Sequence, residues 1–408
     1  MHVIRHRNFD SLSASGQTTW NDLARKVPFR RWDWLEAWWR NYGLHADGSS
    51  TGKQELYVLT VHDNQHNVMG IAPWYRHTTR SGSRVVRFLG DGEVCSDYLS
   101  VLCSDENSIA VTQALASWLV NANRSAAPAS PGDPIRHDDR WDRLEFVGPD
   151  AADAVFNCFL AQLQNVGNLV HFCPAMNTWR LELPPTWDEL LSRLSKQHRN
   201  RLRRADRIYF QSGQIQIRRS IAPDDCAVFF DILLDLHQRR WRHKGLPGAF
   251  ASPRFSAFHR EISARWAAHG LATLSWLEMD DKPLAVEYRL HGDGVMYAYQ
   301  SGMDTQRLEL RPGELANMVA VRSAIEQKQH HYDFLRGDEE YKSRWRAEPR
   351  PMLAVRVIPP FRSARLRHQA WVAGQNVKQW IKRSARLANN LRQPATNPLQ
   401  TATVGDST

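Results

Sequence analysis

Apolar positions along the chain switch between alternating and helical spacing, which predicts a mixed α/β fold. The pattern is clearest between Gly294 and Arg346. An apolar, aromatic run over 295–299 predicts a buried strand, apolar residues at helical spacing predict a helix over 314–328, and the run 331–335 predicts a second strand. A polar loop that ends in Arg311-Pro312-Gly313 separates the first strand from the helix.

This order of strand, loop, helix and strand is typical of a phosphate-binding site. The first backbone N–H groups of a helix have no partner within it and lie at the positive end of its dipole. Arg311 adds a full positive charge beside them. An ordinary strand–helix–strand unit, in which Pro312 and Gly313 only start the helix, explains the same pattern, and both interpretations stay open on spacing alone.

Two predicted hairpins of matching length indicate an internal duplication. The first covers Leu56–Arg76, the second covers Leu271–His291, and their polar turns fall at corresponding places. We therefore predict two α/β lobes with mixed sheets, over residues 1–175 and 176–358. Pro359-Pro360 marks the end of the folded body, so residues 359–408 form a separate basic tail that is helical or disordered.

The segment Arg31 to Trp39 is rich in tryptophan and helical in pattern. Trp34, Leu35 and Trp38 fall on one helical face. Such a face can form an aromatic platform for a ligand. Aromatic side chains four residues apart more often pack into the core, however, and we favour core packing here.

A helical region between the lobes begins with a capping box, in which Thr186 supplies the N-cap hydroxyl and Glu189 follows three residues later. The helix predicted from this point carries eight basic side chains over 193–207, among them Arg199 and Arg203. This density indicates a binding site for phosphate groups. A surface helix whose bases pair with acidic neighbours is the alternative.

Composition excludes several classes of protein. No apolar run reaches the roughly 20 residues that span a bilayer, and the first residues lack the apolar core of a signal peptide. The five cysteines are scattered and show no CxxC spacing, which argues against a disulfide framework and against a zinc site. These features predict a cytoplasmic protein that holds no metal.

The net charge of +10 comes largely from the tail. From Phe361 to Gln400 the chain has eight Lys or Arg residues and no Asp or Glu, whereas the body is only mildly basic. The tail therefore predicts a peripheral contact with a membrane surface, at its inner face, or with an acidic partner protein.

Several motifs together resemble a known group of enzymes. They are Trp187…Ser195-Lys196…Arg199…Leu202-Arg203-Arg204-Ala205, Tyr299…Ser301-Gly302…Pro312-Gly313 and Asp333-Phe334-Leu335…Gly337-Asp338-Glu339-Glu340-Tyr341-Lys342…Trp345, with Ser96-Asp97-Tyr98-Leu99 in the first half. The set, which spans about residues 20–358, resembles the acyltransferases of the CelD/BcsL group in the GNAT superfamily, a group close to the Fem-type peptidyltransferases. The closing Asp-Phe-Leu…Gly…Tyr-Lys…Trp signature is its most specific part.

The resemblance implies two tandem GNAT-like lobes, the second of which binds acetyl-CoA or another acyl-CoA as co-substrate. In GNAT proteins the pyrophosphate rests on the loop and helix start after the central strand, and backbone N–H groups where the strands separate can polarise the thioester carbonyl. The loop here departs from the usual Gln/Arg-x-x-Gly-x-Gly/Ala pattern. The donor-binding residues expected on this basis are Gln300, Ser301, Gly302, Gln306, Arg311, Gly313 and Glu314.

Acyl transfer needs a positioned thioester, a base and donors for the developing oxyanion. Tyr341-Lys342 match an aromatic–Lys pair that is credited, in Fem-type relatives, with stabilising the transition state. Lys342 is therefore expected to point inward and stabilise the oxyanion or a phosphate, while Tyr341 packs against Trp345. A surface lysine is the alternative. Asp338 is expected to orient Lys342 or to cap a short helix.

The remaining site candidates are a base and an acceptor-binding group. Glu287, on the strand beside the expected thioester, is the candidate general base, because core strands rarely hold an unpaired carboxylate. Asp97 and Tyr98, at the end of a first-lobe strand, are candidates to bind the acceptor, together with Arg199 and Arg203 of the basic helix.

Three functions are compatible with these patterns. The first is an acyltransferase that moves an acyl group from acyl-CoA to an amine or hydroxyl of a sugar, peptide or small molecule, in polysaccharide or envelope biosynthesis. The second is an aminoacyl-tRNA-dependent peptidyltransferase, in which the basic helix contacts RNA phosphates. The third is a non-catalytic scaffold of an envelope machine. The mildly basic body and the lack of a long coiled coil in the second lobe favour the first.

Overall fold

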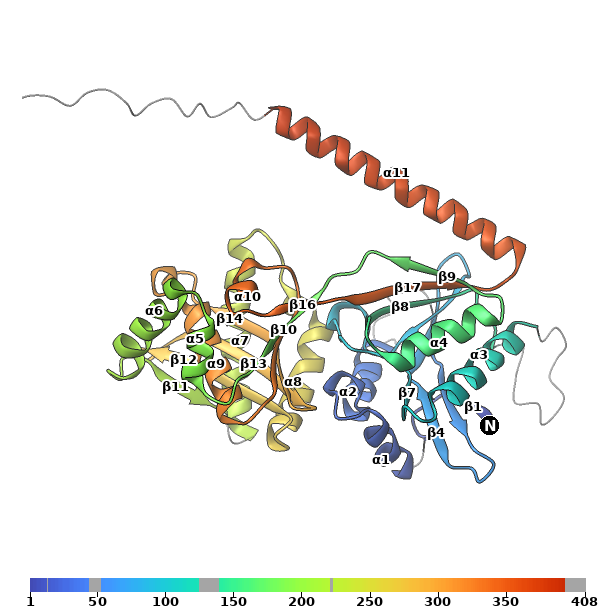
Figure 1. The fold of residues 1–408 in the computed structure, drawn as a ribbon, viewed down its shortest axis with the longest axis horizontal. Coiled ribbons are helices and arrows are strands. Elements are labelled where there is room, and N and C mark those ends of the chain that lie inside the picture. The colour runs from blue at the N-terminus through green and yellow to red at the C-terminus, as the bar shows by residue number, and fades with distance from the viewer. Residues whose placement is uncertain (13, 44–52, 125–138, 221–222, 393–408) are drawn as a thin grey trace, which may run out of the picture. The chain divides into compact units, whose positions relative to one another are not determined.

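The computed structural model describes residues 1–392 except 13, 44–52, 125–138 and 221–222. The chain forms two compact units, residues 1–357 and residues 358–408. The first unit contains two lobes, each of which has a mixed sheet (Figure 1), and the predicted mixed α/β fold is confirmed. The part of the predicted tail over 393–408 lies outside the described residues.

The first lobe holds a four-stranded sheet in the order β1-β3-β4-β7 and a six-stranded sheet in the order β2-β5-β6-β8-β17-β9. Its elements in chain order are β1 (His2–His6), α1 (Ala14–Leu23), α2 (Trp32–Trp38), β2 (Lys53–Leu56), β3 (Val58–His62), β4 (Val68–Ala72), β5 (Trp74–Thr78), β6 (Arg84–Phe88), β7 (Leu102–Cys103), α3 (Ser108–Arg124), β8 (Arg143–Asp150), α4 (Ala154–Asn165) and β9 (Leu169–Cys173).

The second lobe holds one seven-stranded sheet in the order β11-β12-β13-β14-β15-β10-β16. Its elements, with the strand that follows them, are β10 (Thr178–Glu182), α5 (Trp187–Arg193), α6 (Lys196–Ala205), β11 (Gln216–Arg219), α7 (Pro223–His243), α8 (Pro253–Ala268), β12 (Ala272–Met279), β13 (Lys282–Gly292), β14 (Val295–Met303), α9 (Pro312–Glu326), β15 (His331–Arg336), α10 (Glu340–Arg344), β16 (Glu348–Arg350) and β17 (Met352–Ile358).

One strand crosses between the lobes. β10, the first strand of the second lobe, inserts antiparallel between β15 and β16 of its own sheet. β17, which we expected to end the second lobe, inserts instead beside β8 of the first lobe. The six-stranded sheet of the first lobe is therefore completed by a strand from the end of the second half of the chain (Figure 1).

The two predicted hairpins differ in continuity. In the second lobe β12 and β13 pair from Ala272↔Leu290 to Met279↔Lys282 with one register shift. In the first lobe the corresponding strands break at Tyr57 and Pro73, so β3 and β4 join one sheet while β2 and β5 join the other. A proline cannot donate a ladder hydrogen bond, which explains a break at Pro73.

The tryptophan-rich segment packs into the core, as favoured from the sequence. Trp34 is fully buried, its indole N–H donates to Ser96 Oγ at 2.9 Å, and its ring stacks on Trp266 of α8 at 5.0 Å. Tyr299 of β14 meets the same ring edge-on. Aromatic rings from both lobes thus form a shared core.

Buried polar pairs also join the lobes. Arg336 at the end of β15 pairs with Asp97, through Nε at 3.0 Å and through Nη2. The hydroxyl of Tyr98 donates to Asp333 of β15, and Arg180 of β10 contacts the same carboxylate at 3.0 Å. Asp333, which belongs to the closing signature, is fully buried and serves this junction.

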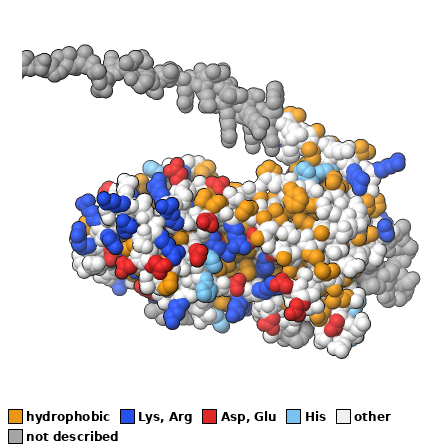
Figure 2. Space-filling model, in the orientation of Figure 1, with side chains coloured by type: hydrophobic (Ala, Val, Ile, Leu, Met, Phe, Trp, Pro, Cys, Tyr) orange, Lys and Arg blue, Asp and Glu red, His pale blue; other side chains and the backbone are white. Residues whose placement is uncertain are grey.

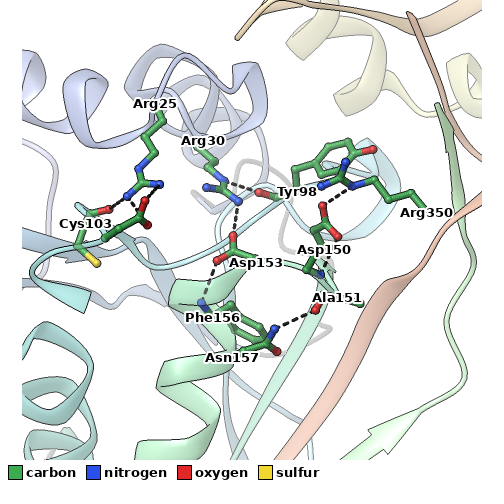
Figure 3. A network of polar contacts seen from close by, with 12 residues as sticks. Arg25, Arg30, Tyr98, Cys103, Asp150, Ala151, Asp153, Phe156, Asn157 and Arg350 are labelled. Atoms are coloured by element: carbon green, nitrogen blue, oxygen red, sulfur yellow. Dashed lines mark hydrogen bonds and ion pairs between the residues drawn. The ribbon is translucent and has the colours of Figure 1, made fainter. Parts of the chain in front are cut away.

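A second polar network ties the N-terminal segment and β16 to the start of α4 (Figure 3). Arg25 pairs with Asp105 at 2.7 Å and Arg30 pairs with Asp153 at 2.6 Å. Asp153 also caps α4 by accepting from the N–H of Phe156 at 2.9 Å. Each arginine here has a carboxylate, so this region is a structural junction.

The basic helical region is two helices, which corrects the single helix that we predicted. Thr186 caps α5 and accepts from the N–H of Glu189, as expected from the capping box. α5 ends at Arg193, and Ser195 then caps α6 by accepting from the N–H of His198 at 3.3 Å. An N-cap serine with extended backbone starts a new helix, so the chain bends there.

The second unit contains α11 (Arg362–Arg392). Of its side chains, Leu366 and Val377 are exposed. Among the described residues, no helix of the protein is both long and apolar enough to cross a membrane.

Candidate active site

The site lies where two parallel strands separate. β14 and β15 pair only over Val295↔His331, Met296↔Tyr332 and Tyr297↔Asp333, although β14 continues to Met303. A bulge follows, because Tyr288 faces Gln300 while Arg289 faces Ala298, which leaves Tyr299 without an opposite residue. The hydroxyl of Tyr299 donates to Val94 of the first lobe at 2.6 Å, which fixes the bulge.

A cavity of about 610 Å³ fills the gap between the separated strands. Its lining comes from β13, β14, α6, the C-terminal part of α7, the start of α9 and the turn 336–345. A volume of this size is typical of a site for a small-molecule ligand. The candidate donor residues that line it are Gln300, Ser301, Gly302, Arg311, Gly313 and Glu314, whereas Gln306 does not.

The loop before α9 presents a helix start to the cavity. Arg311 adopts the left-handed conformation at φ 56° as the N-cap residue, and Pro312 occupies the first helical position. The Arg311 side chain is 57% exposed and pairs with Glu314 at 3.6 Å. A Cβ added at Gly313 would meet only Met303 Sδ, at 3.4 Å, so the backbone there is open. Gln306 instead closes a turn, because its N–H donates to Asp304.

The negative charge of Glu314 is compensated by two basic side chains that were not predicted to line the site. Arg201 Nε donates to its carboxylate at 2.6 Å, and His198 Nε2 lies 3.3 Å away. Although burial alone raises the pKa of Glu314, these two partners lower it to about 2. Both partners come from α6, where Arg201 and His198 face the cavity.

Gly302 lies where α7 packs directly against the backbone of β14. A Cβ there would lie 2.7 Å from the backbone nitrogen of His237 and 2.8 Å from Cβ of Leu236. Both contacts are with α7, which crosses this end of β14. A glycine is therefore needed at position 302, because α7 lies too close to β14 there for a side chain.

Glu287 is a buried carboxyl group in the lining. Its side chain is 11% exposed, it stands opposite Ser301 in the ladder, and its nearest cation is Arg289 at 3.9 Å. Oε2 has no hydrogen-bond partner within the described part of the chain. Burial raises the pKa of Glu287, against a weaker lowering effect of Arg289. An unpaired buried carboxyl facing a cavity is a feature of functional sites.

Lys342 is buried, as predicted, but its protons are engaged. Nζ donates to the carbonyl oxygens of Leu335, Arg336 and Gly337 at 3.1, 3.0 and 2.9 Å. It also lies 2.9 Å from the carboxylate of Glu339. An ammonium group has three protons, so this geometry holds the turn after β15 and favours a positioning role over donation to an oxyanion. The oxyanion role stays a prediction.

The neighbours of Lys342 differ from those expected. Asp338 neither contacts Lys342 nor caps α10; its carboxylate accepts from the indole N–H of Trp179 at 3.1 Å. Glu339, one residue later, is the carboxylate that pairs with Lys342.

Tyr341 and Trp345 do not pack against each other as predicted, because the short helix α10 directs their rings to different neighbours. Tyr341 packs edge-on against Phe334 at 5.8 Å, whereas Trp345 is buried against His198 at 5.0 Å. The Tyr341 ring lines the cavity. Burial, with Glu339 and Glu287 nearby, raises the pKa of its phenol, so the hydroxyl keeps its proton.

The four candidate acceptor residues lie elsewhere. Asp97 and Tyr98 are buried at the junction between the lobes, where they pair with Arg336 and Asp333. Arg199 and Arg203 of α6 do not line the cavity; Arg203 is exposed. The face of α6 that does line it carries His198 and Arg201, three residues apart.

Sequence reasoning also missed one wall of the cavity. His237, Arg240 and Trp241, at positions i, i+3 and i+4 of α7, all line it. That helical spacing was visible in the sequence, but nothing local showed which face of α7 would meet β14. In the described ranges, no three His, Cys, Asp or Glu side chains are arranged to hold a metal ion.

Comparison with known proteins defines the class of this site. Residues 196–343 match the family described as an acetyltransferase (GNAT) domain, and this span holds most of the cavity lining. The second lobe therefore contains a GNAT acetyltransferase domain over these residues. The family implies an acyl-CoA co-substrate and a small acceptor.

Solved structures show the same fold over nearly the whole chain. FemX aligns with a TM-score of 0.59 and 12% identity over 88% of this chain and 98% of its own. A conserved protein of unknown function from Bacteroides thetaiotaomicron VPI-5482 aligns with a TM-score of 0.54 and 9% identity, over 87% and 100%. At these identities the likeness shows the fold alone. No curated protein matches the sequence.

Proposed function

We propose that the second-lobe cavity binds acetyl-CoA or a longer acyl-CoA and transfers its acyl group to an amine or hydroxyl of a small acceptor. The observation that carries the proposal is the cavity at the separated ends of β14 and β15, which adjoins the open start of α9. A carboxyl group without a hydrogen-bond partner, Glu287 Oε2, faces the same space. A ligand that brings phosphates to α9 and a carbonyl to β14 fits this arrangement.

Each group in the cavity has a chemical task in this proposal. The pyrophosphate lies at Gly313 and Arg311, where a helix start and an exposed guanidinium favour negative charge. Glu287 takes the proton from the attacking amine or hydroxyl, since its raised pKa makes it a stronger base than an ordinary carboxylate. Tyr341, which keeps its phenolic proton, donates to the departing thiolate.

Lys342 and Arg336 support these groups from behind. Lys342 donates hydrogen bonds to three consecutive backbone carbonyls at the start of the turn that carries Tyr341. Arg336 links that turn to Asp97 of the first lobe. The first lobe thus holds the position of the turn and takes no direct part in the chemistry.

Release of free thiol from acyl-CoA tests the proposal. Arg311→Ala should raise the KM for acyl-CoA about 10- to 100-fold, the loss expected for hydrogen bonds to a charged group, with little change in melting temperature. Arg203→Ala, an exposed arginine outside the cavity, is the control and should behave as wild type. Wild-type protein that neither binds nor consumes any acyl-CoA would exclude this function.

One observation favours a second candidate, an aminoacyl-tRNA-dependent peptidyltransferase. Figure 2 shows Lys and Arg side chains gathered over the second lobe, on the side where Figure 1 places α5 and α6. In and just after α6, Arg203, Arg204 and Arg207 are exposed. Under this alternative Arg203→Ala should weaken binding of charged tRNA and reduce its steep salt dependence.

For the second unit we infer a peripheral contact with an anionic membrane surface. α11 belongs to a segment with eight basic and no acidic residues, and its Leu366 and Val377 are exposed. A cationic helix with exposed apolar side chains is typical of interfacial binding. A cytoplasmic enzyme acting near the membrane, in polysaccharide or envelope biosynthesis, fits this contact. Sedimentation with anionic vesicles tests it, and loss of binding after truncation at Pro360 is the expected result.

A further inference from the structure

The wall of the cavity opposite the donor loop belongs to α7. Both α7 and α9 pack on β13 and β14, but their buried residues belong to different core clusters, so the two helices cover opposite faces of the sheet. α7 carries Phe229 and Leu233 into the core shared with the first lobe. The separated strands therefore connect the α9 side, where the donor's phosphates belong, to the α7 side.

Arg240 on this wall lacks an acidic partner. No ion pair or side-chain hydrogen bond joins Arg240 to another described residue, and its buried Nε has no hydrogen-bond partner there. The other Arg and Lys side chains of the lining all have carboxylates, in the pairs Arg201–Glu314, Arg289–Glu287, Arg311–Glu314, Arg336–Asp97, Lys342–Glu339 and Arg344–Glu340. A guanidinium left unpaired in a cavity is a site for an external anion.

Trp241 beside it is held in a fixed orientation. Its indole N–H donates to Nε2 of His237 at 2.9 Å, so the proton of that imidazole lies on Nδ1, which faces Oε1 of Gln238 at 3.2 Å. Burial lowers the pKa of His237 to about 4, which keeps the ring neutral and able to accept. The chain of contacts offers a rigid aromatic surface next to Arg240.

Arg240 also lies near the groups assigned to the chemistry. The phenol of Tyr341 is influenced electrostatically by Glu287 and by Arg240, in opposite directions. The candidate base, the candidate acid and the unpaired guanidinium thus share one space. Glu287 also borders residues of α9, so a ligand bound at Arg240 would reach it through the gap between the separated strands.

We propose that the acceptor of this acyltransferase carries a carboxylate or phosphate group, which Arg240 binds while the Trp241 ring lies against the body of the molecule. The inference rests on the proposed function and names its acceptor class. The anion fixes one end of the acceptor and leaves its amine or hydroxyl free to reach Glu287. The donor's phosphates are a different ligand group, because they belong to Arg311 and the start of α9 on the other face of the sheet.

Calorimetric titration of the full chain, without acyl-CoA, tests the binding directly. Two matched pairs serve as probes: glucosamine 6-phosphate against glucosamine, and β-alanine against β-alaninamide. The anionic member of at least one pair should bind wild type about 10- to 100-fold more tightly than its neutral counterpart. The pair that shows the preference identifies phosphate or carboxylate as the anion.

The variants are Arg240→Met, which keeps the apolar stem, and Arg240→Lys, which keeps a charge. Arg240→Met should abolish the preference for the anionic probe and Arg240→Lys should retain part of it. Arg239→Met is the matched control, because Arg239 is an exposed neighbour paired with Asp235 outside the cavity, and it should behave as wild type. Equal binding of both members of each pair, or an undiminished preference in Arg240→Met, overturns the proposal.

Steady-state kinetics separates the acceptor from the donor. With the preferred acceptor, Arg240→Met should raise the KM for that acceptor about 10- to 100-fold. A rise in the KM for acyl-CoA instead would overturn the acceptor assignment, because it would place the donor's phosphates on Arg240. If wild type releases no thiol from acyl-CoA, the proposed function fails, and the calorimetric preference still decides the anion site on its own.

Discussion

The two lobes contain the same central arrangement and use it differently. In each, an antiparallel strand pair is followed by a helix and by a strand parallel to the second member: β5, β6, α3 and β8 in the first lobe, and β13, β14, α9 and β15 in the second. In the second lobe the parallel strands separate around a cavity. In the first, the rings of Phe88, Phe146 and Phe156 pack together in that region.

The first lobe fills the remaining space with its own backbone. A Cβ added to Gly148 of β8 would lie 2.8 Å from the carbonyl oxygen of Ser96, so the segment before Asp97 lies directly against that strand. Gly148 has a φ of 97°, which glycine adopts readily. This segment then supplies Asp97 and Tyr98 to the second lobe.

A strand carboxylate in each lobe, Glu145 in the first and Glu287 in the second, has a different set of partners. Glu145 on β8 contacts Arg87 and Arg143, each at 2.6 Å, and although burial alone raises its pKa, these partners hold the pKa below its usual value. Glu287 on β13 has only a distant arginine, and burial raises its pKa. Glu145 is thus hydrogen-bonded to two arginines, whereas Oε2 of Glu287 has no hydrogen-bond partner among the described residues.

The largest effect is expected from removing the unpaired carboxylate. Glu287→Gln keeps the shape of the side chain but cannot accept a proton, so kcat should fall about 10²- to 10⁴-fold, the usual contribution of a general base. Glu145→Gln is the control in the first lobe and should leave kcat unchanged. A Glu287→Gln enzyme with wild-type turnover would show that the second lobe does not use its unpaired carboxylate.

Breaking the junction should affect stability. Asp97 is 2% exposed in its side chain and pairs with Arg336, so Asp97→Ala leaves a buried guanidinium without its partner. We expect a loss of about 3–5 kcal/mol in the free energy of unfolding, measured by denaturant titration. Asp105→Ala removes an exposed carboxylate, 72% accessible, and should leave the free energy of unfolding close to that of wild type. Similar small losses in both variants would refute the supporting role of the first lobe.

Lys342→Met separates positioning from direct catalysis. The change removes the charge and leaves three backbone carbonyls without their donor, so we expect a loss of about 1.5–3 kcal/mol in unfolding free energy together with lower activity. Thermal and denaturant unfolding measure the first, and thiol release the second. An unchanged melting temperature with a large fall in kcat would restore the oxyanion role predicted from the sequence.

The smallest effect is a pH dependence. Because the folded protein holds the proton of Glu287 to higher pH than the unfolded chain, the unfolded state binds fewer protons above about pH 4.5, and stability falls as pH rises toward the folded pKa. Relative to wild type, Glu287→Gln should therefore gain stability with rising pH, by about 1.4 kcal/mol for each pH unit of that window. A constant difference between the two proteins from pH 4 to 8 would mean that the carboxyl is not perturbed.

Local patterns predicted the elements around the site well. The cap at Thr186 and the strand over 331–335 follow from residues that act within a few positions of themselves, and the helix predicted over 314–328 begins two residues earlier, at Pro312. The resemblance also placed Glu287 and the donor loop at the cavity.

Long-range arrangements were out of reach. The insertion of β10 between β15 and β16 and the crossing of β17 to the first lobe depend on pairing between distant strands, which no local pattern encodes. The partners of Lys342 are backbone carbonyls, which every residue carries, so the sequence does not show which of them it contacts. The part of the cavity lined by α7 could not be predicted without knowing that this helix packs against β14 at Gly302. Asp97 and Tyr98 were noticed as polar residues at a strand end, but their partners belong to the other lobe.

The central claim is that the second lobe alone holds the acyl donor, and titration calorimetry with acetyl-CoA tests it most directly. We expect one molecule bound per chain. We also expect Asn317→Trp, a change at a half-buried lining position on α9, to abolish binding by filling the cavity while the protein stays folded. Two molecules per chain, or undiminished binding to folded Asn317→Trp protein, would contradict it.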